Sequence, residues 1–300
     1  MSPVINGIKV PQNLLGNLIE TNLYESNDID LQNALEKDGY IYIKNVINEE
    51  EISKAREDIF QKLGEVNELK HPFSDGIASG NSNRDVLFSS RGTFWEEVSN
   101  ISSLRNITNG KTLNKIFDKI FGMPSVGFDF IFLRAVGGGK FTHMHCDAGF
   151  FTRKTQKVLT CWLVFTDVPL DKGPLFVIEG SHKYDDIYKK YYGFDVDKDK
   201  NLKASIDSHP VDFAKERKSK ILTAHFNPGD ILIFGMYTVH GTFENHSKDN
   251  KIRLTCDIRF QPQKEPKDPR YFGVNPGGTT GAGYGELNSA RPLNEDWHIR

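Results

Sequence analysis

Two histidines, a cysteine and an aspartate lie within five positions of the segment FTHMHCDAGFF, residues 141–151. If the segment is a strand, side chains two positions apart share a face, so His145 and Asp147 point together and Cys146 points away. An imidazole and a carboxylate, completed by a distant histidine, form the set that binds non-haem Fe(II) and leaves three coordination positions open. A His-x-Asp triplet also occurs by chance, so the rest of the set has to be found elsewhere.

The missing histidine is expected at the end of another strand. The segment NPGDILIFGMYTVHGTFENHS, residues 227–247, begins with a Pro-Gly-Asp turn and continues as an apolar strand that finishes at His240. His240 is therefore the first candidate. His246 lies among polar residues and is the second choice, typical of a solvated loop. His143 competes with His145 for the first position, but only His145 has an aspartate two residues on.

A third chemical signal is a strand with one polar face, in KIRLTCDIRFQP, residues 251–262. Its alternating faces are Arg253, Thr255, Asp257 and Arg259 on one side, and Leu254, Cys256, Ile258 and Phe260 on the other. A polar face that points inward is expected when it lines a ligand cavity of a β-barrel or jelly roll. An arginine there can bind a carboxylate through two parallel hydrogen bonds. The alternative is an arginine that only satisfies a structural carboxylate such as Asp257.

The elements that must position these residues change character along the chain. Residues 31–39 and 48–64 have helical periodicity, and Asn48 with Glu51 forms a capping-box pattern; residues 39–47 between them are typical of a short strand. Strands are then expected at 128–136, 158–168, 174–182, 230–241 and 253–262. The pattern predicts a helix-rich first part and a β-structure after residue 125.

We expect residues 1–300 to form a single domain. Its parts are a helix-rich N-terminal support at 1–124, a β core at 125–262 with an insertion at about 184–220, and a Gly/Pro-rich tail at 263–300. The tail is too rich in glycine and proline for regular elements. It either wraps over the surface or forms a flap over a pocket, and its aromatic residues motivate the second hypothesis.

Composition narrows the possible partners. The 300 residues carry a formal net charge of −2, with 38% hydrophobic and 26% charged residues, and the basic residues are scattered. This favours a small-molecule substrate and gives no sign of a nucleic-acid partner. No run of about 18 apolar residues and no signal-peptide pattern is present, so we expect no membrane partner and a cytoplasmic location. The three separated cysteines are expected to be reduced. Oligomeric state is left open.

In this order, the segments resemble the phytanoyl-CoA dioxygenase family of Fe(II)- and 2-oxoglutarate-dependent oxygenases. The resemblance rests on DGYIYIKNVINEEEISKAREDI, HMHCDAGFF, CWLVFTDVPLDKGPLFVIEGSHK and GDILIFGMYTVHGTFENHSKDNKIRLTCDIRF, and covers most of residues 36–262. It implies a mainly β fold with flanking α-helices around a double-stranded β-helix, the jelly-roll or cupin-like core. The loop between His240 and Arg253 is slightly longer than usual for the family, and the tail after residue 262 matches nothing general in it.

The resemblance also implies roles for single residues. His145, Asp147 and His240 would bind Fe(II), and Arg253, thirteen residues after His240, would bind the distal carboxylate of 2-oxoglutarate. Thr242 matches a hydroxyl that helps to hold the cosubstrate. Two further assignments compete with simpler explanations. Trp162 matches an aromatic residue beside the cosubstrate but could equally be a core tryptophan of the sheet, and Arg259 is the alternative to Arg253.

The implied reaction consumes O2 and 2-oxoglutarate, releases succinate and CO2, and hydroxylates a C–H bond of a small organic substrate, with no separate catalytic acid or base. Halogenating relatives replace the metal-binding carboxylate by a small residue, so Asp147 favours hydroxylation. Two rival functions are a zinc hydrolase that uses the same three ligands and a non-catalytic jelly-roll module that binds a metal or ligand. Substrate specificity is expected in residues 66–95, 184–220 and 263–300.

Overall fold

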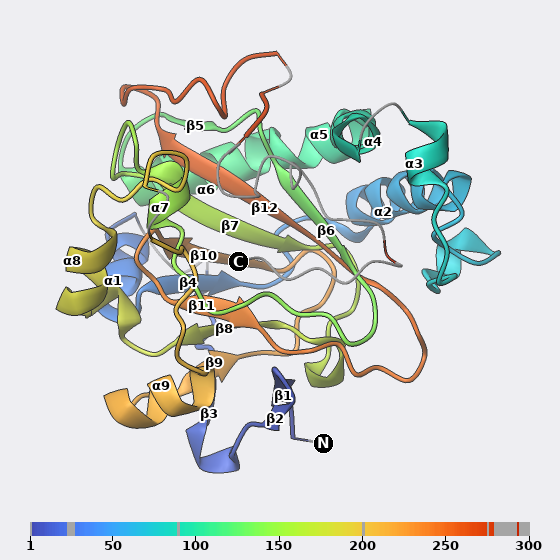
Figure 1. The fold of residues 1–300 in the computed structure, drawn as a ribbon. Helices are drawn as coiled ribbons and strands as arrows, with labels where there is room; N and C mark the ends of the chain where they lie inside the picture. Colours follow the sequence, from blue (N-terminus) through green and yellow to red (C-terminus); the bar gives the residue numbers. More distant parts are fainter. Residues whose placement is uncertain are drawn as a thin grey trace.

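The computed structural model describes residues 2–22, 28–88, 91–199, 202–274, 276–278 and 293, and its centre is a pair of facing sheets (Figure 1). The large sheet has six strands in the order β4-β10-β7-β12-β5, with β6 also paired to β12. The small sheet has the order β11-β8-β9-β3, and β1 and β2 form a separate hairpin. The strands are β1 Val4–Ile5, β2 Ile8–Lys9, β3 Leu15–Asn17, β4 Tyr40–Ile43, β5 Ser125–Gly127, β6 Phe132–Val136, β7 Leu159–Val164, β8 Leu175–Ile178, β9 Ile221–Thr223, β10 Ile231–Gly235, β11 His240–Thr242 and β12 Arg253–Pro262. This arrangement confirms the predicted fold class of a β core with flanking helices.

Helices cover the outer face of the large sheet, and α9 lies beside β9 of the small sheet (Figure 1). The α-helices are α1 Asp28–Asp38, α2 Glu49–Glu65, α3 Arg84–Leu87, α4 Arg91–Ser99, α5 Ser102–Thr108, α6 Lys111–Phe121, α7 Ala148–Phe151, α8 Asp185–Tyr191 and α9 Pro210–Arg217, and the 3-10 turns are Gln12–Leu14, Phe73–Asp75, Leu170–Lys172 and Ser181–Lys183. The expected helix start at Asn48 is confirmed: the side-chain oxygen of Asn48 accepts a hydrogen bond of 2.9 Å from the backbone N–H of Glu51.

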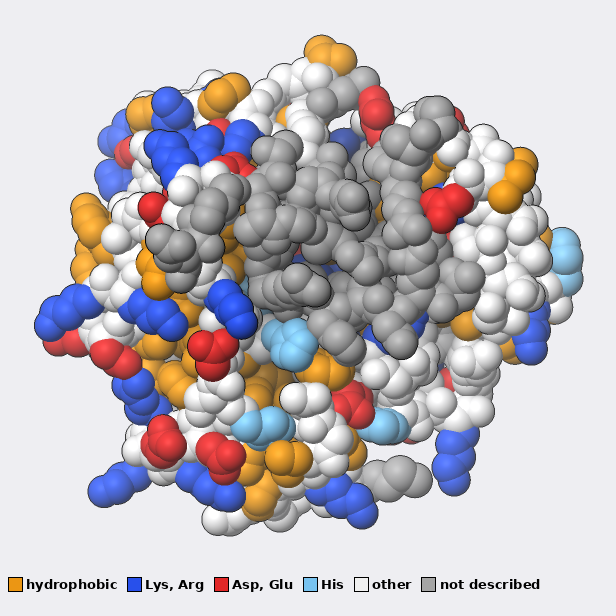
Figure 2. Space-filling model, viewed as in Figure 1, with side chains coloured by type: hydrophobic (Ala, Val, Ile, Leu, Met, Phe, Trp, Pro, Cys, Tyr) orange, Lys and Arg blue, Asp and Glu red, His pale blue; other side chains and the backbone are white. Residues whose placement is uncertain are grey.

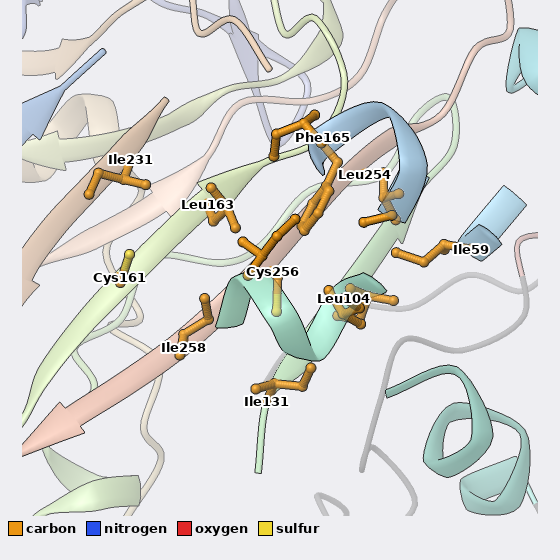
Figure 3. Packing of buried hydrophobic residues seen from close by; sticks show 14 of the residues in the cluster. Ile59, Leu104, Ile131, Cys161, Leu163, Phe165, Ile231, Leu254, Cys256 and Ile258 are labelled. Atoms are coloured by element: carbon orange, nitrogen blue, oxygen red, sulfur yellow. The ribbon is translucent and has the colours of Figure 1, made fainter. Parts of the chain in front are cut away.

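The two faces of β12 separate apolar from polar residues, as the alternation predicts. Figure 3 shows Leu254, Cys256 and Ile258 in one hydrophobic cluster with Ile59 of α2 and Leu104 of α5. These buried side chains belong to the largest hydrophobic cluster, where each contributes about 1.5–3 kcal/mol of burial free energy. Because this outer face is covered by apolar helices, the polar residues of β12 are turned toward the space between the sheets.

A second set of apolar residues fills the space between the two sheets. Trp162 of β7 and Phe234 of β10 contribute from the large sheet, and Val177 of β8 and Leu222 of β9 contribute from the small sheet. The interior is therefore apolar in one part and polar along β12. The polar side chains of β12 are therefore surrounded by buried groups and little water. In such surroundings their charges interact strongly.

The expected strand at 230–241 is wrong in one respect, since the chain forms two strands there. β10 ends at Gly235, a turn follows in which the N–H of Thr238 donates to the carbonyl of Gly235 at 3.1 Å, and β11 begins at His240. β10 lies in the large sheet and β11 in the small one. The chain thus crosses between the sheets just before His240.

The N-terminal part supplies strands as well as helices. β4 pairs with β10 at the edge of the large sheet, and β3 pairs in parallel with β9 at the edge of the small sheet. Within the described ranges, no helix is both long and apolar enough to cross a bilayer. On the face drawn in Figure 2, lysine and arginine side chains are interspersed with aspartate and glutamate side chains.

Much of the Gly/Pro-rich tail lies outside the described residues. In the part that is described, from residue 263 to 274, the chain forms turns and bends, as expected. Tyr271 is buried there, and its ring stacks on Phe128 at a centroid distance of 5.4 Å. Its hydroxyl donates to the carbonyl of Phe150 at 2.8 Å, which ties the start of the tail to α7.

Candidate metal centre

His145, Asp147 and His240 meet in the space between the sheets. Each offers a ligand atom, and the three atoms lie within 4.8 Å of one another. Nε2 of His145 lies 3.5 Å from Oδ1 of Asp147, and Nε2 of His240 lies 3.9 Å from the same oxygen. Donor atoms at right angles around an ion about 2.1 Å away lie roughly 3 Å apart, so a small contraction suffices to hold a metal. All three residues are buried.

Backbone pairing brings the two histidines together. His145 and His240 form an antiparallel β-bridge in which each backbone N–H donates to the other residue's carbonyl at 2.9 Å. Their rings consequently lie side by side, with centroids 4.3 Å apart. The pairing of residue 145 with the first residue of β11 therefore fixes the spacing of two ligands that are distant in the sequence.

The expectation that His145 and Asp147 share one strand is wrong. Asp147 has an αR backbone conformation, with φ −81° and ψ −8°, and it is the N-cap residue of the short helix α7. The chain turns into this helix directly after the bridge at His145, and the turn still presents both side chains to the same side. Cys146 points away, as expected, into an apolar cluster, where burial raises the pKa of its thiol to about 12.

Each imidazole is oriented by a contact with the backbone carbonyl two residues earlier in the chain. Nδ1 of His145 lies 2.8 Å from the carbonyl oxygen of His143, and Nδ1 of His240 lies 3.0 Å from the carbonyl oxygen of Thr238. If Nδ1 carries the proton and donates it to the carbonyl, the lone pair of Nε2 faces Asp147, ready for a metal. Burial, together with the neighbouring His145, lowers the pKa of His240 to about 4, so its ring is neutral at pH 7.

The carboxylate of Asp147 is fixed by hydrogen bonds to one of its two oxygens. Its Oδ2 accepts a hydrogen bond of 2.6 Å from the hydroxyl of Thr160 and one of 3.2 Å from Nη2 of Arg259. Burial alone would raise the pKa of Asp147, but the guanidinium of Arg259 holds it well below its usual range. Asp147 is thus an anionic donor beside two imidazoles, a set that suits Fe(II).

Arg253 is buried without a hydrogen-bonding partner. Its relative exposure is 0%, and Nε, Nη1 and Nη2 have no hydrogen-bond partner among the described residues. Burial, and then the nearby Arg134, lowers the pKa of Arg253 to about 9. A buried cation without a partner is costly unless an anion joins it. The carboxylate of a bound ligand would remove this cost.

Arg259, the alternative to Arg253, has a different environment. It contacts Asp147 and stacks on the ring of Phe151, with the guanidinium carbon 4.3 Å from the ring centroid. Arg134, which the sequence analysis did not single out, donates from Nε to Asp257 at 2.7 Å. The structural carboxylate that we considered for one isolated arginine is therefore bonded mainly by Arg134.

The remaining sequence-predicted residues lie as follows. Oγ1 of Thr242 accepts a hydrogen bond of 2.8 Å from the backbone N–H of Thr142, so this hydroxyl takes part in strand pairing. Trp162 packs edge-on against Phe226, with centroids 4.8 Å apart, in the cluster between the sheets. Nε2 of His246 lies 2.7 Å from Oε2 of Glu244.

Within the described residues, the group that could hold a metal includes neither His143 nor His246. The carbonyl of His143 instead orients His145. Sequence reasoning missed Thr160, although the alternation of LTCWLV, residues 159–164, puts it on the same face as Trp162. This alternation identifies Thr160 as a neighbour of Asp147 only when Asp147 is known to lie over the same face.

Comparison with known proteins places the chain among oxygenases. Residues 35–254 match the sequence profile of the family described as phytanoyl-CoA dioxygenase (PhyH). A 1-deoxypentalenic acid 11-beta-hydroxylase from Streptomyces arenae is 22% identical over 246 residues, which span 77% of this chain and 80% of the relative. The corresponding hydroxylase from Streptomyces exfoliatus matches with the same identity and coverage.

Solved structures of similar fold include EctD from S. alaskensis with 2-oxoglutarate and 5-hydroxyectoine. It has a TM-score of 0.58 and 15% sequence identity, and the match covers 99% of this chain and 94% of EctD. SnoK, a non-haem alpha-ketoglutarate-dependent carbocyclase from nogalamycin biosynthesis, has a TM-score of 0.56 and 15% identity, covering 90% of this chain and 93% of SnoK. At these identities the structural likeness establishes the fold.

Proposed function

This chain belongs to the phytanoyl-CoA dioxygenase family, and on that premise we propose that His145, Asp147 and His240 bind Fe(II) and that Arg253 binds 2-oxoglutarate. The chain is an Fe(II)- and 2-oxoglutarate-dependent dioxygenase that hydroxylates a C–H bond of a small organic molecule. The single observation that carries the cosubstrate site is the buried, unpartnered guanidinium of Arg253. A zinc hydrolase with the same three ligands would have no need of that cation.

When bound, Fe(II) supplies the activation of O2 that couples decarboxylation of 2-oxoglutarate, with release of succinate and CO2, to hydroxylation of the substrate. The protein's own part is position and environment. His145, Asp147 and His240 would hold the metal and would leave coordination positions free for other ligands. The carbonyls of His143 and Thr238 orient the two imidazoles, and Arg253 recognises the distal carboxylate with its planar fork.

Burial of the site contributes to this function. Asp147 has 1% relative exposure and Arg253 has 0%, so their charges act in surroundings with little water, where electrostatic attraction is strong. The buried site also keeps water away from reactive species. Because proton transfer by a side chain is not required for this reaction, no further titratable group has to be assigned. Thr242 and Trp162 remain proposed as secondary cosubstrate contacts.

The proposal is tested by anaerobic titration of the Fe(II)-loaded protein with 2-oxoglutarate, monitored by visible absorption. The expected result is the weak charge-transfer band of chelated 2-oxoglutarate, which disappears in His240→Ala and in Asp147→Ala. Arg253→Met keeps the iron ligands, so this variant should bind Fe(II) and show the band only at much higher 2-oxoglutarate concentration. Iron binding without any band in the wild-type protein would refute the cosubstrate assignment and favour a hydrolase or a binding module.

We further propose a cytoplasmic location, an organisation in one domain, and specificity from residues 66–95, 184–220 and 263–300. The contacts of the second and third segments support the last point. Arg270 of the tail donates to Asp197 of the insertion at 2.6 Å and to the carbonyl of Phe150 in α7 at 3.1 Å. The insertion and the tail thus contact each other next to α7, the helix whose N-cap residue is Asp147. Exchange of these segments for those of a relative should change the substrate profile while 2-oxoglutarate affinity is retained.

A further inference from the structure

Three strands of the large sheet present a row of side chains directly under the metal ligands. Thr160 of β7 is the register partner of Phe234 on β10 and of Arg259 on β12. The ring of Phe234 lies 4.4 Å from the ring of His240, while Thr160 and Arg259 both contact Asp147. Cross-strand neighbours on one face lie within contact distance of one another, so this row forms a common support for two ligands.

The two oxygens of Asp147 have different neighbours. Oδ2 accepts from Thr160 at 2.6 Å and from Arg259 at 3.2 Å. Oδ1 faces Nε2 of His145 at 3.5 Å and Nε2 of His240 at 3.9 Å. A carboxylate can bind a metal through one oxygen or through both. With Oδ2 occupied by two donors, only Oδ1 is available to an ion between the histidines.

We propose that Thr160 and Arg259 are positioning residues that restrict Asp147 to one-oxygen coordination and thereby keep a coordination position open for the cosubstrate. The inference rests on the proposed function, since it concerns the same metal centre. A second bond from Oδ2 would occupy one of the three positions that 2-oxoglutarate and O2 require. The cross-strand pair therefore acts on cosubstrate binding through Asp147, without touching the cosubstrate itself.

The position of Arg259 on β12 favours this role over a purely structural ion pair. The guanidinium is held between Asp147 and Asp257, at 3.2 Å and 3.9 Å, and is stacked on Phe151 of α7. Phe151 belongs to the helix that starts at Asp147. Arg259 thus fixes both the carboxylate and the helix that carries it, and its planar shape is needed for both contacts.

The test uses Thr160→Val, which has the same shape without the hydroxyl, and Thr160→Ser, which keeps the hydroxyl, as its matched control. The first readout is the visible absorption of the Co(II)-loaded protein without 2-oxoglutarate, because its intensity reports coordination number. The second is the pair of dissociation constants for Co(II) and for 2-oxoglutarate. Arg259→Lys serves as a second variant that retains the charge but lacks the fork.

For Thr160→Val we expect an altered Co(II) spectrum and a roughly tenfold weaker 2-oxoglutarate affinity, with Co(II) affinity changed less than the cosubstrate affinity. Thr160→Ser should resemble the wild-type protein. Unchanged spectra and affinities in Thr160→Val and Arg259→Lys would overturn the proposal. Complete loss of Co(II) binding in Thr160→Val would also overturn it, since Thr160 would then hold Asp147 in place and would not select one oxygen.

Failure of this inference is distinguishable from failure of the proposed function. If the wild-type protein bound metal but no 2-oxoglutarate, the proposed function would be wrong, whereas the Co(II) spectra would still decide whether Thr160 and Arg259 control how Asp147 binds. If the wild-type protein bound 2-oxoglutarate and the spectra of wild type and Thr160→Val were identical, the proposed function would stand and the positioning role would be rejected.

Discussion

Replacement of Arg253 by methionine should stabilise the metal-free protein, although it removes the residue that we propose to bind 2-oxoglutarate. The guanidinium is fully buried without a hydrogen-bond partner among the described residues. Replacing a buried charge by an apolar side chain of similar length removes the cost of burying it. The expected result is a rise in the free energy of unfolding accompanied by loss of 2-oxoglutarate binding, a trade-off between stability and function.

The magnitude follows from the pKa of Arg253, which burial lowers by more than three units, to about 9. Each pKa unit corresponds to about 1.4 kcal/mol, so the charged form costs about 5 kcal/mol in the folded state. Because the pKa of Arg253 is lower in the folded than in the unfolded protein, this cost is fully present below pH 9 and declines only above it. Methionine leaves part of the space unfilled, so we expect a net gain of about 1–4 kcal/mol at pH 7.5.

The assay is urea unfolding of metal-free protein at pH 7.5, with Arg84→Met as the matched control. Arg84 is also almost fully buried, at 1% relative exposure, but its Nη2 lies 2.8 Å from Oε2 of the buried Glu68. Its replacement leaves Glu68 without its counter-charge and should cost about 3–5 kcal/mol. The two substitutions are identical in chemistry and similar in burial, and they should change stability in opposite directions.

A second measurement adds metal and 2-oxoglutarate. Saturating cosubstrate at about 100 times its dissociation constant should stabilise the wild-type protein by about 2.7 kcal/mol and the Arg253→Met protein by far less. If Arg253→Met were destabilised as strongly as Arg84→Met, Arg253 would have a compensating partner within the protein. In that case the argument that its guanidinium awaits a carboxylate would be refuted.

Two further predictions concern acid stability and the contacts of the tail. Burial lowers the pKa of His240 from an ordinary 6.5 to about 4. Between pH 4 and pH 6.5 the unfolded state binds more protons than the folded state. Metal-free protein should therefore lose about 3 kcal/mol of stability as pH falls from 6.5 to 4, and a pH series should show a smaller loss in His240→Gln. Arg270→Ala removes hydrogen bonds to Asp197, to Asp268 and to the carbonyl of Phe150, and should speed amide hydrogen exchange in residues 194–199 and in α7; unchanged exchange there would show that other contacts hold these segments.

The sequence predicted three candidate metal ligands that the structure brings together, because each lies in a short recognisable segment and these segments follow one another in the order of the family. His145 and Asp147 are two residues apart, and His240 ends an apolar segment. The alternation of β12 also correctly separated the helix-facing residues from the inward polar ones. These are features of short range, and periodicity and turn residues report them directly.

Other features depended on pairing between distant segments and could not be predicted. Residues on both sides of the turn at Gly235 are apolar and buried, so the hydrophobic pattern does not reveal that the chain changes sheet there. Likewise, Arg253 and Arg259 lie on the same face of β12, and only the register that sets Arg259 opposite Thr160 gives them different partners. Register is fixed by tertiary packing, which a single sequence does not display.

The charges around the site imply that metal and cosubstrate bind cooperatively. Arg134, Arg253 and Arg259 face Asp147 and Asp257, which leaves one excess positive charge among these five interacting residues. A divalent metal adds two positive charges to this buried region, and the dianion of 2-oxoglutarate compensates them. Each ligand therefore improves the electrostatic environment of the other, and linkage requires the effect to be reciprocal. Under the proposed function, the two arginines of β12 have complementary effects: Arg259 keeps Asp147 anionic for the metal, and Arg253 provides a cation for the cosubstrate.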